Sequence, residues 1–464
     1  MNVLDQTIVN VALPTIQRSL HFSPVSLAWV VDGYLITFGG LLLLAGRLGD
    51  LVGRKKTFLV GVSVFTVSSA LCGLATSQAM LIAARFAQGA GAAFSASVVL
   101  AIIVGEFPDP AERIRAMNAY VLVTVAGGSL GLLLGGVLTQ ALSWHWIFMI
   151  NVPLGVATFI AGSLLLDESE GLGIHAGLDI AGAVLSTGGL MLAIYAVVTS
   201  TQYGWLSRHT LSLGLAAVVL LGSFFFLETR LANPLMPIRV LRSRGLGSSC
   251  LVRALMVVGM FGTFYLGALF LQHLLGYGPL ATGLAFLPQT LTVAVMSLGP
   301  SARLIKIFHP KPTALLGFSS IFSGLVLFAL VTPHTAYFPQ VFFALLLIGM
   351  GGAMAFTPLL TIGVSNIPAA DAGLGSGLIN VSQQVSAAVA VAVLSVVAAN
   401  RTHALLATGH SATHALAGGY RLGFVVGAGC AAVGAVVCAV LVPSPSRAQT
   451  ALVDLAPVVE AVDI

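Results

Sequence analysis

The amino-acid sequence predicts an all-α polytopic membrane protein. Of its 464 residues, 58% are hydrophobic and only 8% are charged, whereas a soluble protein carries roughly 25% charged residues. Apolar runs recur along the whole chain between short polar breaks, and most of them reach the length of about 20 residues that a helix needs to cross a bilayer. Because a lipid environment admits only segments that satisfy their own backbone hydrogen bonds, these runs are predicted to be membrane-spanning helices.

The runs predict fourteen spans, arranged as two groups of six with an inserted pair between them. The spans are expected at about 1–17, 26–46, 57–75, 79–105, 116–140, 145–166, 179–199, 209–229, 246–275, 280–304, 312–332, 338–361, 372–399 and 418–442. We therefore expect an N-terminal six-helix half at 1–166, two inserted helices with flanking cytoplasmic loops at 167–244, a C-terminal six-helix half at 245–442 and a cytoplasmic tail at 443–464. The first run lies at the lower limit for a span, so helix 1 is expected to be short or truncated at its start.

Basic residues predict the orientation of the chain. With the N-terminus in the cytoplasm, fourteen of the 20 Lys and Arg residues fall on cytoplasmic segments, two lie within spans and four fall outside. The four outer residues are Arg18, Arg208, Arg401 and Arg421. This positive-inside bias predicts that both termini are cytoplasmic and that the number of spans is even.

Composition also excludes several classes of function. The net charge of +5 is dispersed over short loops, so we expect no nucleic-acid partner. The four cysteines lie in apolar runs without a CxxC pair, which argues against a disulfide framework or a metal site. Neither a catalytic constellation nor a GxxxxGK[ST] phosphate loop occurs. We expect a monomeric, multi-pass protein of the plasma membrane that is no enzyme and needs neither cofactor nor metal.

Three charged residues within the spans are candidates for proton coupling and substrate binding. Asp5 lies in LDQTIVNVALP and Asp32 in WVVDGYLITFGG, on neighbouring predicted helices. A charge at the centre of a membrane helix costs about 2.5–3.5 kcal/mol on insertion scales, so such acids are functional by default. Arg85 needs a partner, and either acid can supply it. Solvation of Asp5 at the cytoplasmic mouth, solvation of Asp32 at the outer mouth and snorkelling of Arg85 remain the alternatives.

Polar amides within the spans either line a cavity or hold helices together. The candidates for the cavity are Asn10, Gln88, Asn380, Gln383 and Gln384. Arg253 has no obvious partner in the sequence, and we expect its side chain to snorkel towards the membrane surface.

The segment GRLGDLVGRKK, residues 46–56, concentrates charge in a chain that has little. We expect a short cytoplasmic loop here, in which glycines permit a tight turn and basic residues retain the loop inside. Asp50 is its only acid and is expected to pair with Arg54 or with a helix N-terminus of the other half. The candidate gate residues are Gly46, Arg47, Gly49, Asp50, Gly53, Arg54 and Lys55.

The fifth predicted helix carries glycines at helical spacing. Gly127, Gly131 and Gly135 recur every four residues on one face, with Gly136 beside them. Small residues at this spacing allow close helix contact and bending.

These motifs together resemble the major facilitator superfamily, in particular its fourteen-helix drug:proton antiporter branch. LDQTIVNVALP and WVVDGY resemble the motifs of helices 1 and 2, the segment 46–56 resembles the signature between helices 2 and 3, and Arg85 with Gln88 and Gly89 matches an RxxQG pattern in helix 4. WHWIFMINVPLG, LFLQHLLGYGPLATGLAFLP and AGLGSGLINVSQQ resemble later motifs. The chain departs from the pattern at Leu132, where antiporters usually have proline, and in the short lead before helix 1.

The resemblance implies a transporter that works by alternating access and is driven by a proton gradient. Asp5 and Asp32 are then coupling or cation-recognising acids, Arg85 is the coupling arginine, and Asp50 and Arg54 hold the cytoplasmic gate. The leading hypothesis is export of hydrophobic or cationic drugs or secondary metabolites in exchange for protons. The alternatives are a dedicated exporter of one metabolite or lipid that confers self-resistance, or a non-transporting membrane sensor or assembly partner.

Overall fold

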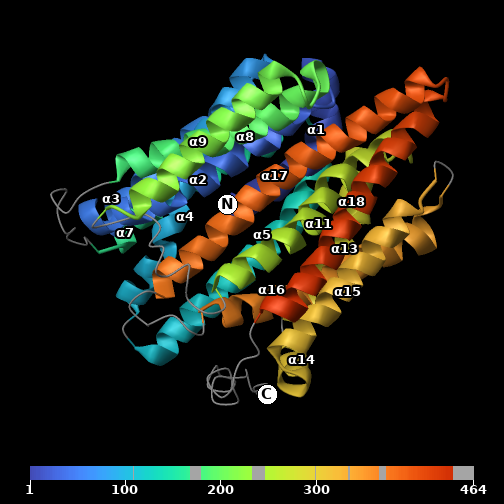
Figure 1. Ribbon diagram of the computed structural model, residues 1–464. Coiled ribbons are helices and arrows are strands. Elements are labelled where there is room, and N and C mark those ends of the chain that lie inside the picture. The colour runs from blue at the N-terminus through green and yellow to red at the C-terminus, as the bar shows by residue number, and fades with distance from the viewer. Residues whose placement is uncertain are drawn as a thin grey trace.

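The protein is a bundle of helices that run side by side along one common direction, as a computed structural model shows (Figure 1). The structure describes residues 1–107, 109–167, 179–231, 246–297, 299–332, 335–364 and 372–442. Within these ranges the regular structure is entirely helical. The helices of the first part are α1 (Asn2–Leu20), η1 (Ser26–Ala28), α2 (Trp29–Val52), α3 (Arg54–Gly73), α4 (Gln78–Glu106), α5 (Pro110–Ala141), α6 (Trp146–Met149), α7 (Asn151–Leu165), α8 (Ile180–Tyr203) and α9 (Arg208–Glu228).

The second part begins at α11 and repeats the same kind of element. Its helices are α11 (Leu246–His273), α12 (Pro279–Ala285), α13 (Leu287–Ser297), α14 (Pro300–Phe308), α15 (Pro310–Ala329), η3 (Tyr337–Val341), α16 (Phe342–Val364), α17 (Ala372–Ala407) and α18 (Ala412–Leu441). Helix α1 is 19 residues long and continues past the polar residues Gln17 and Arg18, where the sequence predicted its end.

Equivalent helices make equivalent contacts in the two parts of the chain. In the first part α1 packs on α5, α2 on α4, α3 on α4 and α3 on α7. In the second part α11 packs on α17, α13 on α16, α15 on α16 and α15 on α18. The two sets correspond helix by helix, as expected of a transporter built from two repeats. The predicted all-α fold is therefore confirmed, and these contacts support the predicted pair of halves, whose division into six helices each stays a prediction.

The two halves meet along helices that are also related by the repeat. Helix α2 packs on α17, α5 packs on α12 and α13, and α1 packs on α11. The inserted helices α8 and α9 pack on each other, and α8 also contacts α2 and α17. The inserted pair therefore lies against the seam between the halves. The predicted boundaries near 167 and 244 adjoin stretches outside the described residues and stay predictions.

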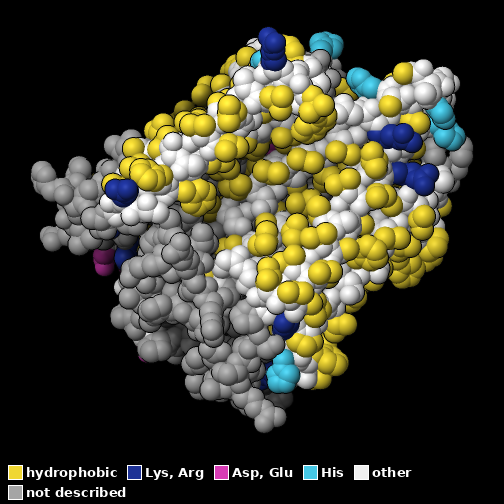
Figure 2. Space-filling view, in the orientation of Figure 1, with side chains coloured by type: hydrophobic (Ala, Val, Ile, Leu, Met, Phe, Trp, Pro, Cys, Tyr) yellow, Lys and Arg dark blue, Asp and Glu magenta, His cyan; other side chains and the backbone are white. Residues whose placement is uncertain are grey.

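The outer surface has the character of a membrane protein. Figure 2 shows hydrophobic side chains over the flank of the bundle, with Lys, Arg and His side chains near its ends. Ten helices of the described chain are long and apolar enough to cross a membrane, and Ser26–Leu42, Leu130–Ala141 and Ala181–Val197 are shorter apolar stretches. A multi-pass membrane protein is thus confirmed, while the count of fourteen and the cytoplasmic termini remain predictions.

The structure corrects the prediction of a loop at 46–56. Helix α2 continues to Val52 and α3 begins at Arg54, so only Gly53 interrupts the helices. Gly53 has φ 112°, a backbone conformation that glycine adopts without steric cost. The predicted tight turn is therefore a single residue, and Arg47, Arg54, Lys55 and Lys56 lie on helices rather than in a loop.

Candidate functional site

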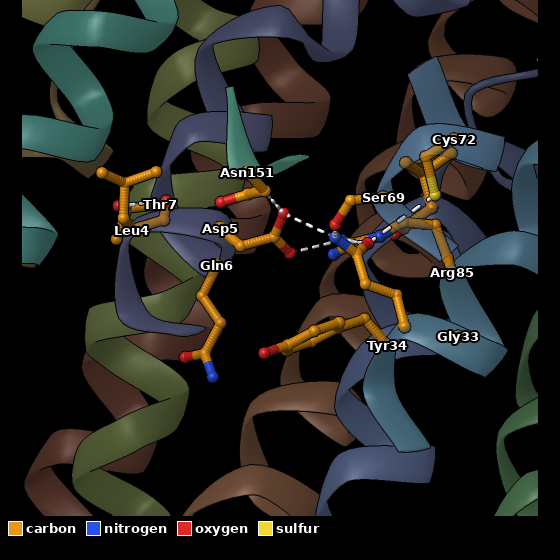
Figure 3. Close-up of polar contacts among 12 residues, drawn as sticks. Leu4, Asp5, Gln6, Thr7, Gly33, Tyr34, Ser69, Cys72, Arg85 and Asn151 are labelled. Atoms are coloured by element: carbon orange, nitrogen blue, oxygen red, sulfur yellow. Dashed lines mark hydrogen bonds and ion pairs between the residues drawn. The ribbon is translucent and has the colours of Figure 1, made fainter. Parts of the chain in front are cut away.

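A buried polar cluster inside the N-terminal half centres on Asp5 (Figure 3). The Asp5 side chain has no solvent exposure, and its Oδ2 lies 2.6 Å from Nη1 of Arg85. Its Oδ1 accepts hydrogen bonds from Nε2 of Gln88 and from Nδ2 of Asn151, both at 2.9 Å. Helices α1, α4 and α7 thus contribute to one carboxylate, and all of its donors are buried. Solvation at the cytoplasmic mouth, the alternative for Asp5, is contradicted by this burial.

Arg85 is held from several sides. Its Nε donates to the carbonyl oxygen of Val30 on α2 at 2.8 Å, and Nη1 also donates to Oε1 of Gln88 at 2.6 Å. The guanidinium lies 4.5 Å from the centroid of the Tyr34 ring, within the range of a cation–π interaction. Arg85 is only 1% exposed, so it does not snorkel. The sequence left its partner open between two acids, and the structure pairs it with Asp5.

Gln88 extends the cluster to α3. Its Nε2 donates to Oγ of Ser69 at 2.7 Å, and Sγ of Cys72 lies 3.6 Å from its Oε1. Ser69, Tyr34 and Asn151 also belong to this site, although the sequence did not predict them. Asn151 lies in the segment WHWIFMINVPLG, but hydropathy alone does not distinguish an asparagine inside the bundle from one at a helix end.

Asp32 lies in a separate place on α2 and is also fully buried. Within the described part of the chain, neither of its carboxyl oxygens has a hydrogen-bond partner. Tyr265 of α11, in the opposite half, is close enough for an electrostatic interaction with it. Solvation at the outer mouth, the alternative for Asp32, is therefore wrong. An ionised carboxylate without donor or counterion is costly in a water-poor interior, so this acid is suited to receive a proton or a cation.

The charged residues at 46–56 bind the ends of neighbouring helices. Nη1 of Arg54 donates to the carbonyl oxygen of Ala101 at 3.2 Å, and Nζ of Lys55 donates to that of Leu166 at 2.6 Å. Cations are favoured near the carbonyl end of a helix, where α4 and α7 finish. Arg47 lies in the last turns of α2, half-buried. The Asp50 side chain lies outside the described residues, so its expected pairing with Arg54 stays a prediction.

Gly49 of the gate segment and the glycines of α5 are sites of close helix contact. A Cβ on Gly49 would collide with the Val98 side chain of α4, whereas one on Gly46 would have its nearest neighbour at 3.8 Å. On α5, a Cβ on Gly135 would lie 2.6 Å from the carbonyl oxygen of Ile8. Gly136 faces the other half, 2.7 Å from the carbonyl oxygen of Pro279 by the same measure.

The other amide residues that the sequence predicted to line a cavity differ in their hydrogen-bond partners. Nδ2 of Asn10 donates to the carbonyl oxygen of Gln6 in its own helix at 3.0 Å. Gln384 is 8% exposed and its Oε1 has no partner among the described residues. Gln383 accepts a hydrogen bond from Arg253. The side chain of Asn380 lies outside the described residues.

A repeated helical bundle with a buried ion pair inside its N-terminal half defines a class, the multi-pass membrane transporters. A family model described as Major Facilitator Superfamily matches residues 1–391, and the chain belongs to that superfamily. The expected family is thereby confirmed.

Curated relatives cover most of the chain. The chain is 36% identical over 455 residues to the puromycin resistance protein of Streptomyces alboniger, and the aligned region covers 96% of this chain and 90% of the relative. It is 36% identical over 405 residues to the cephamycin export protein of Amycolatopsis lactamdurans, with coverages of 86% and 83%. Among solved structures, a bacterial homologue of the human lysosomal transporter Spinster, inward-facing and unoccupied, superposes with a TM-score of 0.66 at 14% identity, covering 99% of this chain and 96% of the other. This last similarity concerns the fold alone.

Proposed function

We propose that the chain exports hydrophobic or cationic drugs or secondary metabolites in exchange for protons, by alternating access of the two halves and without chemical conversion of the cargo. The relatives support export, since their names include resistance to puromycin and export of cephamycin. The observation that carries the proton-coupled part is the burial of two acids: Asp5 is paired with Arg85, and Asp32 has no hydrogen-bond partner within the described ranges.

Asp5 is suited to couple a proton to a change of packing. As a carboxylate it accepts from three donors, and an ion pair of this kind is stable only while both charges are present. Protonation removes the negative charge, so the cation of Arg85 loses its counterion. Only the hydrogen bonds of Arg85 to α2 and to Gln88 then stabilise its buried positive charge, and this favours a rearrangement of α1 against α4.

Asp32 is suited to bind the cargo. It is buried on α2, a helix that packs on α17 of the other half, so it lies near the surface along which the halves meet. A cationic group that approaches Asp32 supplies the counterion that this acid lacks in the described state. Protonation of Asp32 supplies the same neutralisation, so a proton and a cation compete for it.

The gate segment has a supporting role in this proposal. Arg54 and Lys55 tie the end of the α2–α3 turn to α4 and α7, so the cytoplasmic end of the N-terminal half moves as one body. The energy available is sufficient: each proton that enters yields about 2.3 kcal/mol per 100 mV, which corresponds to more than tenfold accumulation.

Purified protein in proteoliposomes tests the proposal. A proton gradient that drives protons across the membrane in one direction should drive the cargo in the opposite direction. Collapse of this gradient by an uncoupler should stop the movement of cargo. Asp5→Asn and Asp32→Asn should each abolish gradient-driven flux. Thr263→Val should not, because it is a nearly isosteric change at a buried position on α11 whose hydroxyl donates to the carbonyl oxygen of Gly259 in its own helix. Gradient-driven flux that persists in both acid variants contradicts proton coupling through these residues.

A dedicated exporter of one metabolite is the second candidate. The names of the relatives favour it, since three refer to a single antibiotic: puromycin, cephamycin and tetracenomycin C. Competition against one transported compound distinguishes the two. Inhibition by many unrelated hydrophobic cations indicates a multidrug exporter, whereas inhibition only by close chemical relatives indicates a dedicated one.

A further inference from the structure

The C-terminal half contains a second buried arginine. Arg253 of α11 is 2% exposed, so the expectation that it snorkels is wrong. Its guanidinium carbon lies 3.7 Å from the centroid of the Phe356 ring on α16, and its Nη2 donates to Oε1 of Gln383 on α17 at 2.8 Å. Three helices of this half therefore position one cation inside the bundle.

Arg253 differs from Arg85 in the partners of its guanidinium. A guanidinium offers five N–H donors, and both Nε and Nη1 of Arg253 are buried without an acceptor among the described residues. In the part of the chain that the structure describes, no carboxylate pairs with it, whereas Arg85 has Asp5. A buried charge without a counterion is strongly unfavourable, and in membrane proteins it marks a place where a ligand or ion supplies the missing charge.

Two neighbours of Arg253 bear on ligand binding, the hydroxyl of Ser249 and the ring of Phe356. Ser249 lies one helical turn earlier on α11 and is 1% exposed, and its Oγ has no hydrogen-bond partner in the described part of the chain. Phe356 is 38% exposed, so the cluster is not closed off completely on this side.

Contacts of α17 place this cluster beside the seam. Oγ of Ser382 donates to the carbonyl oxygen of Cys250 at 3.1 Å, which fixes α17 against the turn of α11 that carries Arg253. The residue after Gln383, Gln384, packs against Gly39 of α2, where a glycine Cβ would lie 3.0 Å from its Cβ. Arg253 is thus one side chain away from the surface that the halves share.

We infer that Arg253 is the recognition site for a carboxylate group of the exported cargo. The inference rests on the proposed export function and narrows its substrates to amphiphiles that carry an acid. A carboxylate accepts two parallel N–H bonds from one edge of a guanidinium, and Arg forms such pairs better than Lys because its donors are coplanar. The aromatic face of Phe356 supplies apolar contact on the same cluster, and Ser249 supplies a hydroxyl.

A matched pair of dyes tests the inference: a cationic rhodamine methyl ester and the corresponding rhodamine free acid, which differ only in the carboxylate. Binding to the purified full chain in detergent is measured by fluorescence polarisation. Loss of a charge-assisted hydrogen bond should weaken binding about tenfold to hundredfold, so Arg253→Gln should lower the affinity for the free acid by that factor and leave the ester within about twofold. Arg253→Lys should retain part of the preference.

Controls keep the outcomes distinct. Thr263→Val, on the same helix, should leave both affinities unchanged. Equal loss for acid and ester in Arg253→Gln, or wild-type protein that does not prefer the acid, overturns the inference and leaves Arg253 a packing residue. If Arg253→Gln does not fold, the wild-type preference together with its reduction in Arg253→Lys decides. Absence of gradient-driven flux for both dyes contradicts the proposed export function, while the acid preference is read from binding alone.

Discussion

The ion pair between Asp5 and Arg85 permits a quantitative prediction. Its two side chains are 0% and 1% exposed, and Nη1 and Oδ2 are 2.6 Å apart. Asp5→Asn leaves a buried cation without its counterion, which should lower the free energy of unfolding by about 3–5 kcal/mol. Arg85→Met leaves the carboxylate with Gln88 and Asn151 as its donors and should also be destabilising.

The double variant Asp5→Asn/Arg85→Met isolates the interaction. Because neither charge is then left alone, its loss should be smaller than the sum of the single losses, with a coupling energy of about 1.5–3 kcal/mol. Transport should nevertheless stay abolished, since the proton-binding acid is gone. The free energy of unfolding is measured by titration of mixed micelles with a denaturing detergent.

A control cycle and a refuting result complete the test. Asp5→Asn combined with Thr263→Val joins residues that share no partner, so their effects should add within about 0.5 kcal/mol. A coupling energy below that limit for Asp5 and Arg85 would refute the reasoning, because it would mean that the two charges are stabilised independently by their other neighbours.

Two further predictions concern helix contact and the gate. Gly131→Ala should destabilise the bundle by about 1–3 kcal/mol, since its Cβ would collide with Oγ1 of Thr7 and lie 2.7 Å from the carbonyl oxygen of Leu4. Gly127→Ala, whose Cβ would have its nearest neighbour at 3.6 Å, should be neutral or should stabilise the helix by up to about 1 kcal/mol through the helix propensity of alanine. Thermal unfolding in detergent compares the two variants. Asp50→Asn should reduce transport severely while expression and substrate binding persist, and normal flux in this variant would restrict the segment to an anchor of topology.

Much of the fold could be predicted because hydropathy is a local property. A stretch such as 57–75 must be a helix if it lies in lipid, whatever its neighbours are, and the structure has α3 at Arg54–Gly73. The same reasoning singled out Asp5, Asp32 and Arg85, since a charge in an apolar run is costly in any arrangement. It did not predict that α2 continues through 46–52, because glycines and charges signal a break whether or not a neighbouring helix permits continuation.

The partners of the charged residues were decided only by the tertiary structure. Arg85 had two acids available in the sequence. The packing of α1 on α5 and α4 places Asp5, 80 positions away, at its guanidinium, while Asp32 has no hydrogen-bond partner among the residues that the structure describes. Arg253 shows the same limit, because only the packing of α16 and α17 decides that Phe356 and Gln383, and no described carboxylate, lie at its guanidinium. The free-energy cost of burying a charge depends on the residue and on the apolar segment that carries it, so the sequence reveals it. Whether a second charge offsets that cost depends on how close another segment brings its side chain, and only the packing of the helices determines this.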